Sequence, residues 1–462
     1  MDKQWTSCLP PVCAGLGAAC FAGTAAVCVR LDLGGILDRS GVAFALLALC
    51  ALAVVLLKWE RTPKRLLLVM LLPIGAAMLV RALCLDYAGL DYEGFLKQWY
   101  AFFKNNGGFR AMAYAVGDYN VPYLYFMAFI SYLPVPELYL IKLFSIVFDV
   151  VLAWGVFRLV SVLRGEREGD CVPLVSFAIT LFLPTVILNG AYWAQCDAIY
   201  GALAVHAVAL VLKGRNKTSV ALMALAFSFK LQAIFILPLW GVLWLAGKVK
   251  FRELWIFPLT YLIVVLPAVA LGKPLWETLA IYFNQMGEYT RLTLNAPSIF
   301  QLFPYHMTIV PSDGSPLLEG LSTAGVVVTA AFVLGILALG LRLRERLDRK
   351  TAFAIGAVLA VGVPFLLPHM HERYYFLADI LTLCWACADI RPAPAAAAAL
   401  VQCSSAASYR VWLRQKFNWT FYIGKNRYVM VPEMLAMLAG LVLTVMGLIG
   451  CLRGKTAKEG PA

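Results

Sequence analysis

Twelve residues late in the chain, 368–379, concentrate side chains that can bind an anion or a metal ion. The segment reads PHMHERYYFLAD, and it carries His369, His371, Glu372 and Arg373 between two apolar runs. Charged groups are costly inside hydrocarbon, and they are retained there mainly where they have a function. The segment is therefore expected at a membrane boundary, in contact with a ligand.

Two kinds of ligand fit this segment. Histidine and glutamate bind zinc, but His369 and His371 are only two residues apart and no H-E-x-x-H spacing is present. For an anion, Arg373 can donate bidentate hydrogen bonds to phosphate oxygens, His371 can be a second donor, and Glu372 can hold the arginine in place. The sequence favours the anion, and a phosphate at a membrane boundary belongs to a lipid or to a lipid-linked molecule.

Two aspartates stand out in the first long polar segment. Asp91 begins DYEGFLKQWYAFF, whose aromatic residues recur at helical spacing, and residues 105–108 (NNGG) should end that amphipathic helix. Asp118 lies in GDYNVP, where Pro122 can open the next helix. Each aspartate can serve as a helix N-cap or as a general base, and the sequence leaves both roles open.

Two further segments place polar residues beside or inside apolar runs. In YWAQCD, Gln195 and Asp197 can belong to an interfacial aromatic belt with polar caps, but Asp197 opens an apolar run where a carboxylate is costly. In FSFKLQAIFILP, Lys230 and Gln232 have apolar neighbours on both sides. A lysine near a helix end can reach the headgroups, but Lys230 is expected to meet an anion or a carboxylate.

The elements that carry these residues are membrane helices. Of the 462 residues, 62% are hydrophobic and 14% are charged, whereas a soluble domain has about 25% charged residues. Apolar runs near the ~20 residues that cross a bilayer recur, so the sequence predicts an all-α, polytopic transmembrane bundle of about 12–14 spans. The expected spans are 13–29, 41–57, 65–84, 138–163, 172–189, 198–212, 254–272, 320–341, 351–367, 374–390, 394–408 and 430–452.

Three stretches do not fit a simple span count. Residues 122–133 are too short for an ordinary span. Residues 218–247 are too long for one span and are interrupted by Lys230 and Pro238, which predicts two half-length helices or a hairpin. Residues 409–427 are basic, and they fall on the unexpected side of the membrane if the other spans are right.

The net charge of +13 reflects cations in the loops on one side of the membrane, and it gives no reason to expect a nucleic-acid partner. Lysine and arginine gather in short loops, which places those loops in the cytoplasm. Residues 85–121 and 273–319 are then two large extracytoplasmic loops that carry short amphipathic helices. The chain, 1–462, is expected to form one multi-pass domain in the cell membrane, in contact with membrane lipids.

The order of these segments resembles a known superfamily. GDYNVPYLYF, YWAQCDAIY, FKLQAIFILP and HMHERYYF, after an aspartate-bearing first loop, are similar to segments of the GT-C integral membrane glycosyltransferases. The closest likeness is to bacterial relatives of the second mannosyltransferase of GPI-anchor assembly. A more distant likeness is to the endoplasmic-reticulum glucosyltransferases that extend the N-glycan precursor. The similar segments run from about residue 85 to residue 380.

The resemblance implies a hexosyltransferase, and a mannosyltransferase in the closest case, that uses a polyprenyl-phosphate sugar at the extracytoplasmic face. Its acceptor would be a glycan, a lipid or a protein of the cell envelope. The general base would be Asp91, with Asp86 as an open alternative, and Asp118 would be the second aspartate. Four residues would bind the donor phosphate, namely Lys230, Gln232, His371 and Arg373, and four would line the substrate cavity, namely Gln195, Asp197, Glu372 and His369. The resemblance implies no certain cofactor, although a divalent metal held by carboxylates stays possible.

The chemistry agrees with this placement. A phosphate leaving group needs positive charge or strong donors, while an acceptor hydroxyl needs a base within hydrogen-bond reach. The sequence has no Rossmann fingerprint or glycine-rich phosphate loop for a nucleotide sugar. The main alternative is a lipid or solute transporter with a polar pathway, but the internal repeats typical of transporters are not visible.

Overall fold

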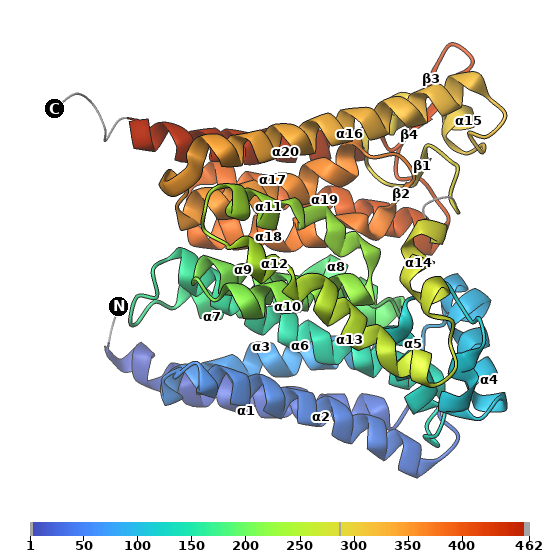
Figure 1. Cartoon of the computed structure of the whole chain (residues 1–462). Helices are drawn as coiled ribbons and strands as arrows, with labels where there is room; N and C mark the ends of the chain where they lie inside the picture. Colours follow the sequence, from blue (N-terminus) through green and yellow to red (C-terminus); the bar gives the residue numbers. More distant parts are fainter. Residues whose placement is uncertain (1–2, 286–287, 457–462) are drawn as a thin grey trace. The chain divides into compact units, whose positions relative to one another are not determined.

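The computed structural model describes residues 3–285 and 288–456 (Figure 1). The chain divides into two compact units. The first unit comprises Met1–Arg158, Cys171–Ala202 and Pro267–Pro274, and the second comprises Leu159–Asp170, Leu203–Leu266 and Leu275–Ala462.

The prediction of an all-α, polytopic membrane protein is confirmed. In the described part of the chain, eight helices are long and apolar enough to cross a membrane, or nine if the pair Val172–Phe182 and Pro184–Tyr192, bent by 48°, counts as one span. The eight are Leu9–Cys28, Ile36–Trp59, Lys64–Ala82, Glu137–Leu163, Phe251–Ala270, Pro316–Leu343, Arg349–Leu366 and Val431–Arg453.

The span count is lower than the predicted 12–14, because several apolar runs fold into helices too short to cross alone. The predicted span 394–408 lies in α19 (Pro392–Arg414), which is not among these eight helices. The run 198–212 becomes α9 (Asp197–Leu212), 122–133, already too short for an ordinary span, becomes α5 (Val121–Ile130), and 374–390 becomes α18 (Phe376–Ala388). Helices of 16, 10 and 13 residues fall short of the ~20 needed for a bilayer.

In the first unit, α1 (Lys3–Cys28), α2 (Ile36–Trp59) and α3 (Lys64–Ala82) lie side by side (Figure 1). Glycines bring α1 and α3 together. A Cβ added at Gly17 would lie 2.7 Å from the carbonyl carbon of Leu71, and one at Gly75 would lie 3.0 Å from the carbonyl oxygen of Gly17. Small residues of this kind permit close helix contact in membranes, where no hydrophobic effect drives helices together.

The first large loop folds as predicted into a short helical layer. It contains η1 (Tyr92–Leu96), α4 (Lys97–Asn105) and η2 (Gly108–Ala113), followed by α5. The helix ends where the glycines predict, with Asn106 as C-cap and Gly107 at φ 80°. The unit also contains α7 (Val172–Phe182), α8 (Pro184–Ile187) and η3 (Leu188–Tyr192), together with the first part of α6 (Glu137–Leu163) and the beginning of α9.

The second unit contains the predicted interrupted stretch 218–247. Helix α10 (Asn216–Phe229) ends at Lys230, whose backbone is extended at φ −155° and ψ 132°. A 3-10 turn, η4 (Leu231–Ile236), follows, and α11 (Pro238–Leu245) begins at the proline. The predicted interruption at Lys230 and Pro238 is therefore confirmed.

The rest of the second unit is built around α16 (Pro316–Leu343), α17 (Arg349–Leu366), α19 (Pro392–Arg414) and α20 (Val431–Thr456). Helix α17 contacts α16, α18 and α20, and α20 also packs along α19 (Figure 1). The remaining helical segments are α12 (Phe251–Leu254), α13 (Ile256–Ala270, which continues into the first unit), α14 (Leu275–Gln285), η5 (Ile299–Leu302), α15 (Tyr305–Thr308), η6 (Arg344–Arg346) and η7 (Glu372–Tyr375).

Two small sheets complete the second unit. Strands β1 (Thr293–Leu294) and β2 (Met370–His371) pair in parallel, so the loop before α16 is tied to the end of α17. Strands β3 (Thr420–Ile423) and β4 (Asn426–Val429) form an antiparallel hairpin between α19 and α20. The hairpin lies at the basic segment that did not fit the predicted topology.

Candidate functional site

The first unit joins two of the predicted site residues directly. The side-chain amide of Gln195 donates a hydrogen bond from Nε2 to Oδ2 of Asp91 at 2.7 Å, across 104 positions of sequence. The hydroxyl of Tyr119 donates to Oε1 of the same amide at 3.3 Å. This second bond fixes which end of the amide faces the carboxylate, so Gln195 holds one oxygen of Asp91 and leaves the carboxylate in a defined orientation.

Asp91 does not act as the helix cap that its position suggested. Its backbone is already helical, at φ −66° and ψ −35°, and its side chain makes no capping hydrogen bond to η1 in the described structure. The side chain is half-buried. A carboxylate that is partly desolvated and oriented by a side-chain donor suits proton transfer better than capping.

The next residue fixes this end of the loop to α6. Tyr92 is buried, and its hydroxyl donates to Oε1 of Glu137 at 2.8 Å. Burial and then the bond to Glu137 raise the pKa of Tyr92 well above its ordinary value. The phenol therefore keeps its proton and continues to hold the start of η1 in place.

An irregular turn presents Gln195 to Asp91. The π-helical segment η3 ends at Tyr192, and Ala194 then adopts a positive φ of 64°. The backbone of Gln195 is held from both sides, because its N–H donates to the Asn189 carbonyl at 2.8 Å and its carbonyl accepts from the Ser145 hydroxyl at 2.6 Å. These bonds fix the backbone from which the Gln195 side chain reaches Asp91.

Asp197 and Asn189 close the same turn. The Asn189 side chain donates to Oδ2 of Asp197 at 2.6 Å and accepts from the Asp197 backbone N–H at 3.1 Å. Both residues are fully buried. This reciprocal pair explains why an aspartate opens an apolar helix, and it suits a residue that positions Gln195.

Asp118 lies next to Tyr119 in the bend before α5, and it is exposed. Asp118 was expected either to cap α5 or to act in catalysis, but the N-cap of α5 is Asn120, whose side chain accepts a hydrogen bond from the Val121 N–H. The bend packs tightly on Trp99: Gly117 has a φ of 60°, and a Cβ there would lie 2.5 Å from the indole ring. Tyr119 packs edge-on against the same indole, with 5.1 Å between ring centroids. Contacts with Trp99 therefore hold the bend that contains Asp118 in place.

Asp86, the alternative base, has a different environment. Its Oδ1 accepts from the Tyr139 hydroxyl at 2.7 Å and from the Asp32 backbone N–H at 3.2 Å. These two bonds tie the start of the loop to α6 and to the α1–α2 connection. The arrangement gives Asp86 a structural role and leaves Asp91 as the better candidate for the base.

Sequence reasoning missed three buried charged residues of the first unit, Arg81, Lys142 and Asp149. Arg81 and Asp149 form a buried ion pair, with 2.8 Å between Nε and Oδ2, and both side chains are 0% exposed. Lys142 donates to the carbonyls of Cys84, Leu85 and Tyr87 at 2.7–2.8 Å. Each lies in a predicted span, where an ionisable residue is itself a signal of function.

The second unit holds the residues expected at the donor phosphate. Glu372 is fully buried, and Oε1 of its carboxylate lies 3.4 Å from Nη1 of Arg373. Its Oε2 lies 3.8 Å from Nδ1 of His371. Both contacts are long for hydrogen bonds, so the expected role of Glu372, to hold Arg373 in place, stays a prediction.

Aromatic rings surround His371. Tyr289 meets the imidazole edge-on, with 4.6 Å between ring centroids, and Tyr374 lies 5.2 Å away. The Arg373 guanidinium lies 5.9 Å from the centre of the Tyr374 ring. Sequence reasoning did not single out Tyr289, because it lies 82 positions before His371 in a segment without a motif.

His369 is engaged in the fold on both ring nitrogens. Its Nε2 pairs with the Ser322 hydroxyl at 2.7 Å, and its Nδ1 pairs with the Arg291 carbonyl at 2.7 Å. The residue also has a positive φ of 65°. These contacts fasten the end of α17 to α16 and to the segment before β1, and a substrate contact would have to displace one of them.

Lys230 and Gln232 lie at the break between α10 and η4, and both are buried. Phe235 of the same turn packs on Tyr374, with 6.2 Å between ring centroids. The break and the His371 segment are therefore parts of one neighbourhood in the second unit.

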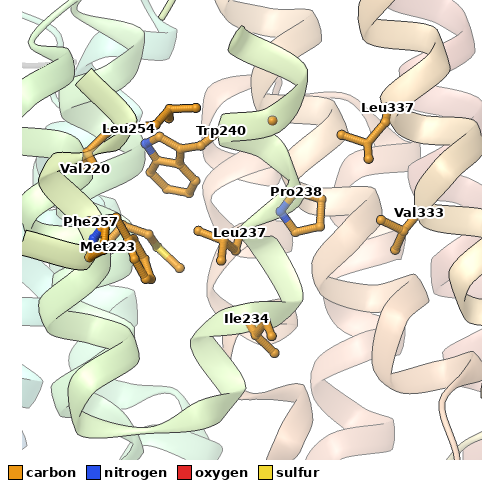
Figure 2. A pocket seen from close by; sticks show the side chains of 12 residues that line it. Val220, Met223, Ile234, Leu237, Pro238, Trp240, Leu254, Phe257, Val333 and Leu337 are labelled. Atoms are coloured by element: carbon orange, nitrogen blue, oxygen red, sulfur yellow. The ribbon is translucent and has the colours of Figure 1, made fainter. Parts of the chain in front are cut away.

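A cavity of about 470 Å³ opens beside the same break. In Figure 2, Ile234, Leu237 and Pro238 lie between Val220 and Met223 on one side and Val333 and Leu337 on the other. All twelve lining residues are apolar or glycine: Val220, Met223, Ile234, Leu237, Pro238, Trp240, Gly241, Leu254, Phe257, Pro258, Val333 and Leu337. A cavity of this kind suits a hydrocarbon chain.

The described residues contain no cluster of metal-ligating side chains that fits the metal alternative. Within 3–285 and 288–456, no group of three or more histidine, cysteine, aspartate or glutamate residues could hold a metal ion.

Comparison with known families gives one match. Residues 119–368, more than half of the chain, match the sequence model of glycosyltransferase family 87. The match includes Gln195, Asp197, Lys230 and Gln232, whereas Asp91 and His371 lie outside it. No curated protein matches the chain.

Proposed function

The chain belongs to glycosyltransferase family 87, and from that premise we propose that it transfers a hexose from a polyprenyl-phosphate sugar to an acceptor hydroxyl outside the cytoplasm. It is a multi-pass membrane glycosyltransferase, so it needs a sugar donor and an acceptor. The family match therefore favours an enzyme over the transporter considered from the sequence. In this proposal the enzyme is of the GT-C type, the sugar is mannose, and the acceptor is a glycan, lipid or protein of the cell envelope.

The hydrogen bond between Gln195 and Asp91 carries this proposal. The carboxylate of Asp91 is oriented by the side-chain amide of Gln195, which Tyr119 holds in turn, while Ser145 and Asn189 bind the backbone of Gln195. A fixed, half-buried carboxylate can accept the proton of an acceptor hydroxyl as the oxygen attacks the anomeric carbon. The bond from the anomeric carbon to the phosphate oxygen breaks, polyprenyl phosphate leaves, and a single displacement inverts the anomeric carbon.

The second unit supports a donor that carries both a phosphate and a hydrocarbon chain. Lys230, Gln232, His371 and Arg373 offer donors that suit a phosphate. The adjoining cavity is lined by apolar side chains, which suits the isoprenoid part of such a lipid. Under this proposal the active site faces the extracytoplasmic side of the cell membrane, and 85–121 and 273–319 are extracytoplasmic loops of one membrane domain, 1–462.

A transfer assay with purified protein in vesicles tests the proposal. Polyprenyl-phosphate mannose is supplied as donor, polyprenyl-phosphate glucose as the competing donor, and an alkyl mannoside as the acceptor probe. We expect donor-dependent formation of a disaccharide with inverted configuration, read by mass spectrometry and by anomeric proton coupling. Activity with a nucleotide sugar and none with either lipid donor would refute the proposed donor.

The base is tested in the same assay with two matched variants. Asp91→Asn should lower turnover by roughly 10²–10⁴-fold, because general base catalysis contributes about that much. Asp86→Asn is the control, since the bonds to Tyr139 and to the Asp32 N–H mark it as structural. Loss of activity in the Asp86 variant, with the Asp91 variant still active and both proteins folded, would assign the base to Asp86.

A further inference from the structure

The hairpin of β3 and β4 carries an unusual concentration of positive charge. Residues 409–430, from the end of α19 to the start of α20, contain no aspartate or glutamate and five cations: Arg410, Arg414, Lys416, Lys425 and Arg427. All except Arg427 are exposed. A segment with this composition attracts anions.

The hairpin lies at the end of the second unit that is predicted to be extracytoplasmic. It packs on η5 and α15, which precede α16 (Figure 1). The Arg427 guanidinium stacks on Tyr305 at 4.9 Å and on Phe417 at 5.4 Å from the ring centres. The basic loop 344–350 follows α16 and therefore lies at its other end. Cations are expected to concentrate in cytoplasmic loops, so topology alone does not explain the charges of the hairpin.

The base of the hairpin is fixed to the first turn of a membrane helix. The Asn418 side chain donates to the Ala407 carbonyl at 3.1 Å and to Oε1 of Glu433 at 2.9 Å. Val429 and Met430 are buried in a small core. Because Val431–Arg453 is apolar enough to cross a membrane, the hairpin is held within a few residues of the hydrocarbon boundary.

The outer strand of the hairpin presents large apolar side chains. All four residues of β3 are exposed, and Trp419, Tyr422 and Ile423 are 61%, 67% and 68% exposed. An exposed apolar edge strand is a liability in water and is usually covered. Tryptophan and tyrosine favour the headgroup region of a bilayer, and lysines beside them are attracted to anionic headgroups.

We propose that residues 416–427 form a membrane-docking surface that binds the anionic phospholipid headgroups of the adjacent leaflet. Ile423 and the aromatic rings enter the headgroup layer, and Lys416 and Lys425 pair with lipid phosphates. A second copy of the chain could also cover the apolar strand, but two such hairpins would repel each other through their cations. Charge therefore selects the lipid surface.

Fluorescence quenching in vesicles tests the docking. The full chain with Ile423→Cys is labelled with bimane, in a background that carries Cys171→Ser and Cys403→Ser because both cysteines are exposed. The vesicles contain phosphatidylcholine alone or a mixture with phosphatidylglycerol. We expect a headgroup nitroxide to quench the label more strongly, and aqueous iodide to quench it less, when phosphatidylglycerol is present.

Charge variants separate docking from simple proximity to the bilayer. Lys416→Gln and Lys425→Gln should each weaken the phosphatidylglycerol-dependent state roughly fivefold, as expected for one lysine near an anionic surface. Lys217→Gln, an exposed lysine at the start of α10, should leave the quenching unchanged. Equal iodide quenching in both vesicle types would overturn the proposal. Self-quenching between labelled chains in both vesicle types would overturn it in favour of a second copy.

Discussion

Replacing Asp149 by asparagine should destabilise the first unit by about 3 kcal/mol, because breaking a buried ion pair by removing one charge costs about 3–5 kcal/mol. Asp149 and Arg81 are both completely buried, and Nε of the guanidinium lies 2.8 Å from the carboxylate. Arg81 would keep two other partners, since its Nη1 donates to the Ala77 and Leu181 carbonyls at 3.1 Å and 2.9 Å. These bonds place the expected cost at the lower end of the range.

The assay is unfolding of the purified protein by SDS titration, followed by circular dichroism and read as an apparent free energy of unfolding. The matched control is Glu60→Gln, which removes the charge from the Arg158 pair at 3.4 Å. Both of those side chains are about a quarter exposed, and pairs near the surface contribute about 0–1 kcal/mol. The control should therefore unfold close to wild type.

The double variant Arg81→Met/Asp149→Leu distinguishes a buried unpaired charge from a simple loss of packing. Replacing both charges with apolar residues of similar size is often neutral or stabilising, so the double variant should be more stable than Asp149→Asn. If Asp149→Asn unfolded within about 1 kcal/mol of Glu60→Gln, or if the double variant were the least stable, the argument from burial would be wrong.

Two more predictions concern catalysis. Gln195→Leu keeps a similar side-chain volume but removes a hydrogen bond to a carboxylate, which is worth about 1.5–3 kcal/mol. We therefore expect kcat/KM to fall by roughly 10–150-fold. Unchanged kinetics in a folded protein would show that Gln195 has no part in the reaction. Arg373→Lys keeps the charge but loses the two-pronged geometry, so the KM for the lipid donor should rise and Arg373→Ala should raise it further. Combining Arg373→Ala with His371→Ala should cost less than the sum of the single effects if both residues bind one phosphate, and strict additivity would contradict a shared site.

Most of the long apolar helices could be predicted from hydropathy, because burial in lipid or protein requires a continuous apolar sequence, but hydropathy also predicted spans where the shorter helices α9 and α18 lie. The expected spans 320–341, 351–367 and 430–452 become Pro316–Leu343, Arg349–Leu366 and Val431–Thr456. The break at Lys230 was also predictable, since a lysine and a proline interrupt one long apolar run, but the sequence did not decide between two half-length helices and a hairpin.

The contacts between distant segments could not be predicted. Gln195 and Asp91 are 104 positions apart, and Arg81 and Asp149 are 68 apart. Polar residues at separate points of a chain show that partners are needed, but only the packing of the helices determines which pair forms. The hairpin was missed for a related reason, because strands of four residues in an aromatic, basic segment leave too short a pattern to recognise.

Three of the predicted site residues, Gln195, Lys230 and His371, lie where a regular helix is broken or has ended. Gln195 follows a π-helical turn and an alanine at φ 64°, Lys230 stands in extended backbone between α10 and η4, and His371 follows a histidine at φ 65° at the end of α17. Irregular backbone is tolerated at membrane depth only where protein buries it or where it lines a cavity. A break in a helix leaves backbone groups without a regular helical partner. In a polytopic enzyme, an apolar run broken by a polar residue is therefore a reason to test that residue first, and here those residues are Gln195, Lys230 and His371.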